Sequence, residues 1–145
     1  MKSIGGGVFI DVKRFTKEIE NAKKKYFMEC ERAAKTVGAM MEKEAKIMLS
    51  HPGTGRVYRR GGVEHQASVA GQPPAKDRGL LQASVTNEVV GSGTSIEVRV
   101  GTNKEYGKRL EFGDSRIAPR PWLFRTIKEN WAKALNIWST RLDRK

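Results

Sequence analysis

Residues 12–49 carry the feature that most restricts the fold, an unbroken helical periodicity over more than a quarter of the chain. Apolar residues recur there at spacings of three, four or seven, as on one face of an α-helix. They are Phe15, Ile19, Ala22, Tyr26, Cys30, Ala33, Val37, Met40, Met41, Met48 and Leu49. Such a helix would be about 57 Å long, so either it kinks near Gly38, its only weak point, or part of its stripe packs on another subunit.

The net charge of +12 is the strongest compositional signal in these 145 residues. The positive charge falls on the expected helices and the long loop, whereas the expected sheet region, residues 79–117, is neutral. A positive exterior favours DNA, RNA or an acidic protein surface as a partner, and a merely solvated surface is the other interpretation. The chain length predicts a single domain, residues 1–145.

The first ten residues are expected to be a flexible segment. The glycines at 5–7 predict a hinge, the apolar triplet at 8–10 predicts a short strand or a docking tag, and Asp11 is expected to cap the helix. This start lacks the apolar core of a signal peptide, and no stretch approaches the roughly 20 apolar residues of a spanning helix. We therefore expect folding in a cytoplasm and no membrane partner.

Few residues offer chemistry for catalysis or metal binding. Cys30 is the single cysteine, and its place within the expected helix predicts a small core residue. His51 and His65 have no companion nucleophile, and with Cys30 they lack the tight spacing of a metal site. We expect neither an enzyme nor a cofactor.

Residues 51–78 are rich in glycine and proline and show little periodicity. So long an irregular stretch inside a compact domain is unusual. It carries Arg56, Arg59 and Arg60 around Tyr58, a combination that suits stacking on single-stranded nucleic acid. A disordered lid, an extended arm that orders on assembly, and a nucleic-acid loop all stay open.

Residues 79–101 predict an antiparallel hairpin with one buried and one polar face. The alternating apolar positions are Leu81, Ala83, Val85, Ile96, Val98 and Val100. The glycine-rich turn is expected at residues 91–94, and it lacks the strand–helix context of a phosphate loop.

The connection 102–117 is expected to form a helical turn or a third strand, with Tyr106, Leu110 and Phe112 buried and Gly113 at a positive φ. Residues 118–142 predict a second helix with Pro121 in its first turn. Its apolar stripe consists of Leu123, Ile127, Trp131, Ala134, Leu135, Trp138 and Leu142. The sequence thus predicts an α+β fold with a long N-terminal helix, a small antiparallel sheet built on a β-hairpin, a C-terminal helix and a long Gly/Pro-rich arm.

Short motifs between residues 71 and 123 follow a distinctive order. They are Gly71-Gln72-Pro73-Pro74-Ala75, Gly79-Leu80-Leu81 with Ser84-Val85, Val100-Gly101-Thr102-Asn103 with Tyr106, Leu110-Glu111-Phe112-Gly113, and Ala118-Pro119-Arg120-Pro121-Trp122-Leu123. This order resembles that of the neck and tail-completion proteins of long-tailed phages, the family of the tenth gene product of the Hong Kong lambdoid phage. The chain departs from the family pattern at Arg78 and Asp114, where threonine is commoner, at Pro119, which separates the usual Ala-Arg pair, and at Trp122, where phenylalanine is usual.

The resemblance implies a structural protein of the virion, in the neck, assembled in the host cytoplasm. It implies a ring, a hexamer or a dodecamer, that joins the head connector to the tail and leaves a channel for DNA. The implied partners are other copies of the chain, a head-closure or connector protein, a tail terminator or tail tube protein, and double-stranded DNA. The alternative hypothesis is a basic nucleic-acid-binding protein.

We expect the arm, residues 51–78, to order against a neighbouring subunit or a neighbouring ring. Its interface residues are expected to be Arg56, Tyr58, Arg59, Arg60, Gln72, Pro73 and Pro74. The residues expected to hold the protomer in shape are Gly101, Tyr106, Leu110, Glu111, Phe112, Gly113, Pro121 and Trp122, with the two glycines and Pro121 setting turns. Glu111 has basic neighbours in Lys108, Arg109 and Arg116, and we expect an ion pair within or between subunits.

Overall fold

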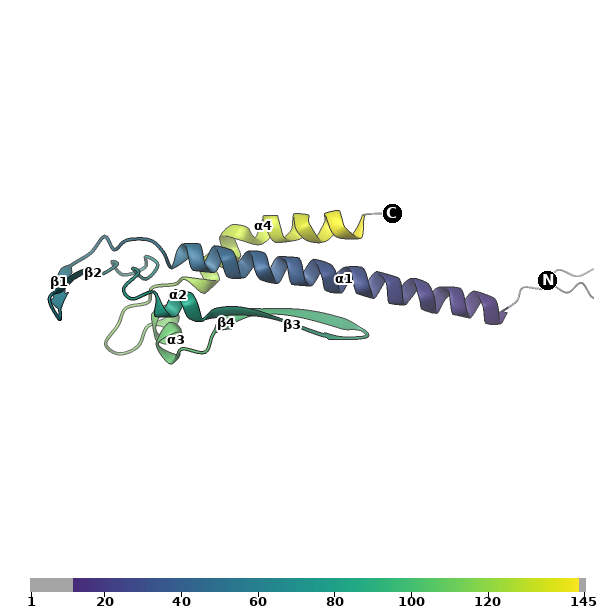
Figure 1. The fold of residues 1–145 in the computed structure, drawn as a ribbon, viewed down its shortest axis with the longest axis horizontal. Helices are drawn as coiled ribbons and strands as arrows, with labels where there is room; N and C mark the ends of the chain where they lie inside the picture. The colour runs from purple at the N-terminus through teal and green to yellow at the C-terminus, as the bar shows by residue number, and fades with distance from the viewer. Residues whose placement is uncertain (1–11, 144–145) are drawn as a thin grey trace, which may run out of the picture.

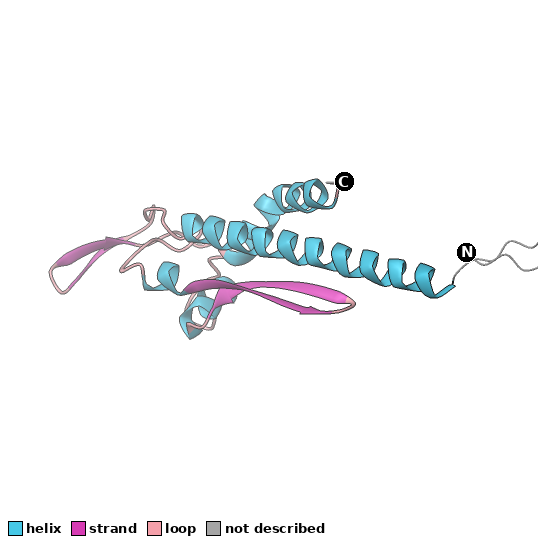
Figure 2. Cartoon of the chain, turned by 45° about the vertical axis from the view of Figure 1, so that its right-hand side comes forward, coloured by secondary structure: helices cyan, strands magenta, loops and turns pink. Residues whose placement is uncertain are grey.

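The computed structural model describes residues 12–143, and α1 (Val12–Met48) confirms the expected long helix. The helix runs through Gly38 without interruption, and both views show a single rod rather than a kinked one (Figure 1, Figure 2). The predicted kink near Gly38 is therefore wrong. The expected hinge, the apolar triplet at 8–10 and the Asp11 cap lie outside the described residues.

Helix α1 is the spine of the molecule, and the other elements pack along its C-terminal part (Figure 1). Helix α4 (Leu123–Leu142) lies along one side, antiparallel to α1. A hairpin of β3 (Val85–Ser92) and β4 (Ser95–Thr102) lies along another side. The expected α+β class is confirmed.

Three smaller parts lie toward the C-terminal end of α1 (Figure 2). The short helices α2 (Leu80–Ser84) and α3 (Glu105–Phe112) sit at the base of the hairpin. Strands β1 (Val57–Arg60) and β2 (Val63–Gln66) form a second, separate antiparallel hairpin beyond the end of α1.

The β3–β4 hairpin packs closely on α1 at Gly38. The strands pair from Val85 opposite Thr102 to Ser92 opposite Ser95. A Cβ atom at Gly38 would lie 2.6 Å from Oδ1 of Asn87 and 3.3 Å from Cγ1 of Val98. The glycine that weakens the helix locally is thus the point where the hairpin approaches it.

The sequence places the start of the first strand of this hairpin earlier than the structure does. Leu81 and Ala83 lie in α2, and β3 starts only at Val85. Alternation over so few residues does not separate one helical turn from a strand. The turn predicted at Gly101 is also wrong, because Gly101 lies within β4 opposite Thr86.

The core follows the C-terminal part of α1 in two clusters. The first contains Ala45, Leu49, Leu81, Val85 and Trp122. The second contains Val37, Met41 and Ala134. Val100 of β4 packs against both clusters, so the hairpin and α4 meet over one continuous stretch of α1. Cys30, expected in the core, is half-buried.

Helix α4 begins later in the sequence than expected, and fewer of its apolar side chains are buried. Its first residue is Leu123, so Pro121 precedes the helix rather than lying in its first turn. Ala134 is buried, but Trp131 and Leu135 are 57% and 54% exposed. The predicted stripe is therefore wrong at these two positions, because α4 packs on the core with Ile127, Ala134, Ile137 and Trp138 instead.

Candidate assembly surfaces

The arm, residues 51–78, is not the structureless loop that its composition predicts. Its first part folds into the β1–β2 hairpin, with Val57 opposite Gln66 and Arg60 opposite Val63. Gly61 and Gly62 form the turn, both at positive φ (56° and 81°), which glycine adopts without steric cost. The two glycines between polar strands were the available signal for this hairpin.

The β1–β2 hairpin projects from the body and exposes most of its side chains. Val57 and Val63 are 53% and 69% exposed. Arg56 and Arg59 are exposed as well, and Arg59 pairs with Glu64 across the strands at 3.3 Å. The Tyr58 ring packs edge-on against His65, with centroids 5.2 Å apart. The structure thus brings the predicted arginines and Tyr58 onto one projecting ribbon.

Two interactions join this hairpin to the rest of the chain through Asp77. Arg60 Nη1 lies 3.8 Å from Asp77 Oδ2, and His65 Nδ1 lies 3.7 Å from Oδ1. These distances are long for ion pairs, and the arginine pair is exposed, so their contribution is small.

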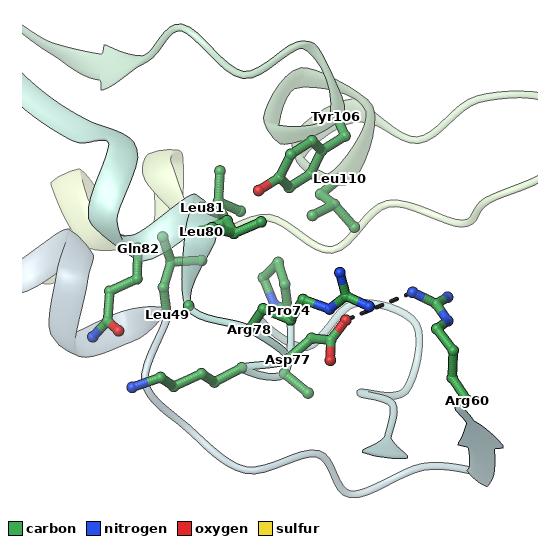
Figure 3. A pocket seen from close by; sticks show the side chains of 13 residues that line it. Leu49, Arg60, Pro74, Asp77, Arg78, Leu80, Leu81, Gln82, Tyr106 and Leu110 are labelled. Atoms are coloured by element: carbon green, nitrogen blue, oxygen red, sulfur yellow. Dashed lines mark ion pairs between the residues drawn. The ribbon is translucent and has the colours of Figure 1, made fainter. Parts of the chain in front are cut away.

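A cavity of about 430 Å³ separates the arm from the α2–α3 corner. Figure 3 shows Leu80, Leu81, Tyr106 and Leu110 gathered on one side, with Arg60 and its partner Asp77 on the other. Pro74 is buried beside this cavity and Pro73 is half-buried. Gln72 is exposed, and its Oε1 lies 3.5 Å from Arg125 Nη1.

Arg120 ties the base of the arm to the body, a role the sequence did not indicate. Its Nε and Nη2 donate to the carbonyl oxygen of Ser68 at 3.3 and 3.2 Å. Its backbone N–H donates to Leu110, and Pro119 accepts from Gly71 N–H at 2.9 Å. The segment 118–122 therefore connects the arm, α3 and α4.

Trp122 is the packing residue that the sequence predicts. It is 1% exposed, and its Nε1 donates to the carbonyl oxygen of Gly107 at 3.2 Å. Gly107 is necessary here, because a Cβ atom would lie 2.7 Å from Thr102 Cγ2 and 2.9 Å from Leu81 Cδ1. A glycine within a helical segment was the only sequence signal for this close approach.

Glu111 forms no ion pair with another side chain among the described residues of its own chain; it caps α4. Its Oε2 accepts the backbone N–H groups of Trp122 and Leu123 at 2.8 and 2.9 Å. Its Oε1 accepts the N–H of Phe124 at 2.9 Å. These are donors that a helix leaves unsatisfied at its start, where a negative charge is also favourable. Gly113, at φ 71°, confirms the expected turn immediately after α3.

The expectation that Tyr106 and Phe112 are buried is wrong, since they are 41% and 73% exposed. Leu110 between them is half-buried. Phe112 instead borders a largely apolar cavity of about 420 Å³ together with Phe124 of α4, which is 68% exposed. Trp131 follows Phe124 by seven residues and Leu135 follows Trp131 by four, so all three lie on the same side of α4.

Phe112, Phe124, Trp131 and Leu135 thus form one exposed apolar set. A second exposed apolar set lies at the other end of the molecule. It comprises Val12, Phe15, Ile19 and Tyr26 of α1, which are 68%, 56%, 39% and 60% exposed. Exposed apolar area of this extent is typical of interaction surfaces.

Among residues 12–143, no group of three or more His, Cys, Asp and Glu side chains is placed to hold a metal ion. His51 is exposed and His65 lies in the arm against Tyr58. No helix in the described part of the chain has the length and apolarity to cross a membrane.

Comparisons with protein-family models, with curated proteins and with solved structures gave no significant match.

Proposed function

We propose that this protein is a structural, non-enzymatic subunit of a phage neck. Copies of the chain form a ring, a hexamer or a dodecamer, that joins the head connector to the tail and leaves a channel for DNA. The motifs between residues 71 and 123 support this function through their resemblance to neck and tail-completion proteins. The proposed location is the virion, and the proposed partners are the head-closure or connector protein and the tail terminator or tail tube protein.

The projecting β1–β2 hairpin is the observation that carries this proposal. An isolated two-stranded hairpin is marginally stable in water. This one exposes Val57 and Val63 and is held to the body by two long interactions with Asp77. The strand register puts Val57 and Val63 on opposite faces of the ribbon. A neighbouring subunit that encloses the ribbon would cover both valines and stabilise the hairpin, and head-to-tail contacts between different faces form a ring when the rotation between subunits closes.

The accessible surface also supports an assembling protomer. The chain exposes 10947 Å², whereas a compact monomer of 16.2 kDa exposes about 7,500 Å². An allowance of about 160 Å² for each terminal residue outside the described range still leaves an excess of more than about 1,000 Å². One standard interface buries about 800 Å² of each partner, so contacts with two neighbours would cover an excess of this size.

The test removes the apolar contact that the arm offers. Val57→Asp with Val63→Asp should leave the circular dichroism spectrum and the thermal unfolding of the isolated protein unchanged. It should abolish both ring formation, measured by light scattering with purified tail tubes present, and the joining of tails to heads. Thr86→Asp, on the outer face of β3, is the matched control and should assemble like the wild type.

Two results would count against the neck function. One is a protein that binds neither tails nor connectors under any condition. The other is normal head–tail joining by the doubly substituted arm.

The arm also favours a second candidate function, binding to nucleic acid. Its ribbon carries Arg56, Arg59 and Arg60 beside Tyr58, and a two-stranded ribbon can enter the major groove of DNA. DNA binding by the isolated protein, weakening steeply with salt and lost in an Arg59→Ala, Arg60→Ala variant, would favour this function. Binding only after tail tubes are added would favour the neck.

A further inference from the structure

The N-terminal part of α1 extends beyond everything else in the described structure. Helix α4 and the β3–β4 hairpin both end well before the start of α1 in two views (Figure 1, Figure 2). Every side chain from Val12 to Tyr26 is exposed. Yet this part of the helix is amphipathic, with Val12, Phe15, Ile19, Ala22 and Tyr26 at alternating spacings of three and four. These five residues are called the free stripe.

The free stripe continues the seam that α4 covers farther along the helix. Ala33 follows Tyr26 by seven residues, and Val37 follows by four more. Both are buried, and Val37 belongs to the cluster that contains Ala134 of α4. Since residues seven apart stay on nearly the same side of a helix, the free stripe is where a helix following α4 along α1 would lie.

The end of α4 leaves room for such a helix. Lys133 Nζ of α4 pairs with Glu44 Oε1 of α1 at 2.7 Å. The helices are antiparallel, so at about 1.5 Å per residue Leu142, the last residue of α4, lies level with about residue 35 of α1. The free stripe begins at Tyr26, about two and a half helical turns beyond that level.

We propose that a second copy of this chain covers the free stripe, with the two α1 helices antiparallel. This pairing does not depend on the proposed neck function. In the antiparallel register Phe15 of each helix packs on Tyr26 of the other. Ile19 of each helix packs on Ala22 of the other, which places the large residues against each other at the ends and the small one in the middle.

Charge complementarity selects this partner and this register. Glu18 and Lys25 lie beside the free stripe, one residue before Ile19 and before Tyr26. In antiparallel helix pairs, residues at these flanking positions face each other across the seam. Glu18, whose Oε1 also accepts from Arg14 Nε of the same helix at 3.1 Å, therefore faces Lys25 of the other copy, giving two attractive pairs per dimer. Lys13, Lys17 and Lys24 point away from the seam, and Lys23, on the other flank of the stripe, faces the uncharged Thr16 of the other copy.

A parallel pair is excluded by the rest of the fold. It would place the C-terminal part of the second α1 along the seam that α4 already occupies. The antiparallel pair sends the two bodies to opposite ends and makes a two-fold contact that closes at two copies. A ring contact is head-to-tail, so the neck assembly would use other surfaces.

Charge reversal in the full-length protein tests the pairing. Sedimentation velocity of the purified wild type should show a concentration-dependent dimer. Glu18→Lys or Lys25→Glu alone replaces two attractive pairs by two repulsive ones, and each should weaken the dimer roughly tenfold or more. A mixture of the two variants restores both attractive pairs and should form a heterodimer, as should the double variant with itself. Ile19→Lys should give a folded monomer by circular dichroism, since Ile19 is already exposed.

Several outcomes would overturn the pairing. A wild type that stays monomeric at millimolar concentration is one, and association with vesicles of anionic phospholipid would then identify a membrane surface as the occupant of the free stripe. A dimer or ring that persists in the Ile19→Lys protein would show that its contact lies elsewhere. Single reversals that weaken the dimer without rescue in the mixture would exclude this register.

Discussion

The carboxylate of Glu111, at the end of α3, accepts the backbone N–H of Trp122 at 2.8 Å, just before α4 begins. The same carboxylate accepts the N–H groups of the next two residues. Helix α4 itself has no side-chain cap from its N-cap residue, Trp122. One glutamate eleven residues earlier thus performs the capping that a local serine or aspartate usually provides.

The first prediction concerns this cap. Glu111→Ala should lower the free energy of unfolding by about 2 kcal/mol, because three helix donors lose their acceptor and the helix start loses a negative charge. Glu111→Gln keeps an acceptor and should cost about 1 kcal/mol. Urea unfolding measures both. Glu105→Ala is the control, since Glu105 is an exposed residue of the same helix, and its effect should stay within about 0.5 kcal/mol.

The second prediction concerns the turn between α3 and the segment 118–122. Gly113 has φ 71°, and a Cβ atom there would lie 2.8 Å from the carbonyl oxygen of Ile117. Gly113→Ala should therefore lower the unfolding free energy by about 2 kcal/mol or more. Gly93→Ala, in the open β3–β4 turn where no atom lies within 4 Å, should be neutral. Equal effects at the two glycines would contradict the strained geometry assigned to Gly113.

The third prediction sets helix propensity against packing at Gly38. Alanine is favoured over glycine within a helix by about 1 kcal/mol. At Gly38, however, the added methyl would meet Asn87, whose amide is held by a hydrogen bond to Glu42. Gly38→Ala should thus destabilise the protein by about 1 to 2 kcal/mol despite the propensity gain. Ala39→Gly, at the adjacent exposed position, measures the propensity term alone, and thermal unfolding of the two variants separates the effects.

The fourth prediction is a pH dependence. The hydrogen bond from Lys46 and then that from Asn87 hold the pKa of Glu42 below its ordinary value of 4.5. Because the folded pKa is the lower one, the stabilisation is complete above about pH 4.5 and is lost as the pH falls through the folded pKa. Glu42→Gln should cost about 1 kcal/mol at neutral pH, and this difference from wild type should shrink in acid. A difference that stays constant from pH 7 down to pH 3 would rule out this linkage.

The sequence predicts the long helices and the main hairpin because each has many residues with one clear period. Helix α1 and the strands around Val89 and Val98 illustrate this. It fails where a few residues must decide, as at Leu81 and Ala83, which form one helical turn. It also fails for burial, since Trp131 and Phe112 are as apolar as Trp122. What separates them is how many elements converge on each position, which no local pattern records.

For the candidate surfaces, too, the sequence predicts some features and misses others. Tyr58, Arg59 and Arg60 of the arm lie on one exposed ribbon, a hairpin that the sequence analysis did not predict. The roles of Glu111 and Arg120 depend on partners in other segments, and charge alone suggests ion pairs instead. In both residues the charged group binds backbone atoms, an outcome that requires knowing where helices begin and where loops pass.

The base of the arm is closed by two backbone hydrogen bonds, from Gly55 N–H to Ala67 and from Ala67 N–H to Arg56. Beyond that closure the ribbon contributes no residue to either core cluster. Mutations between Val57 and Gln66 are therefore nearly free of the constraints that folding places on the body. Sequence variation can therefore alter the exposed surface of the ribbon while the helical spine that carries it stays the same.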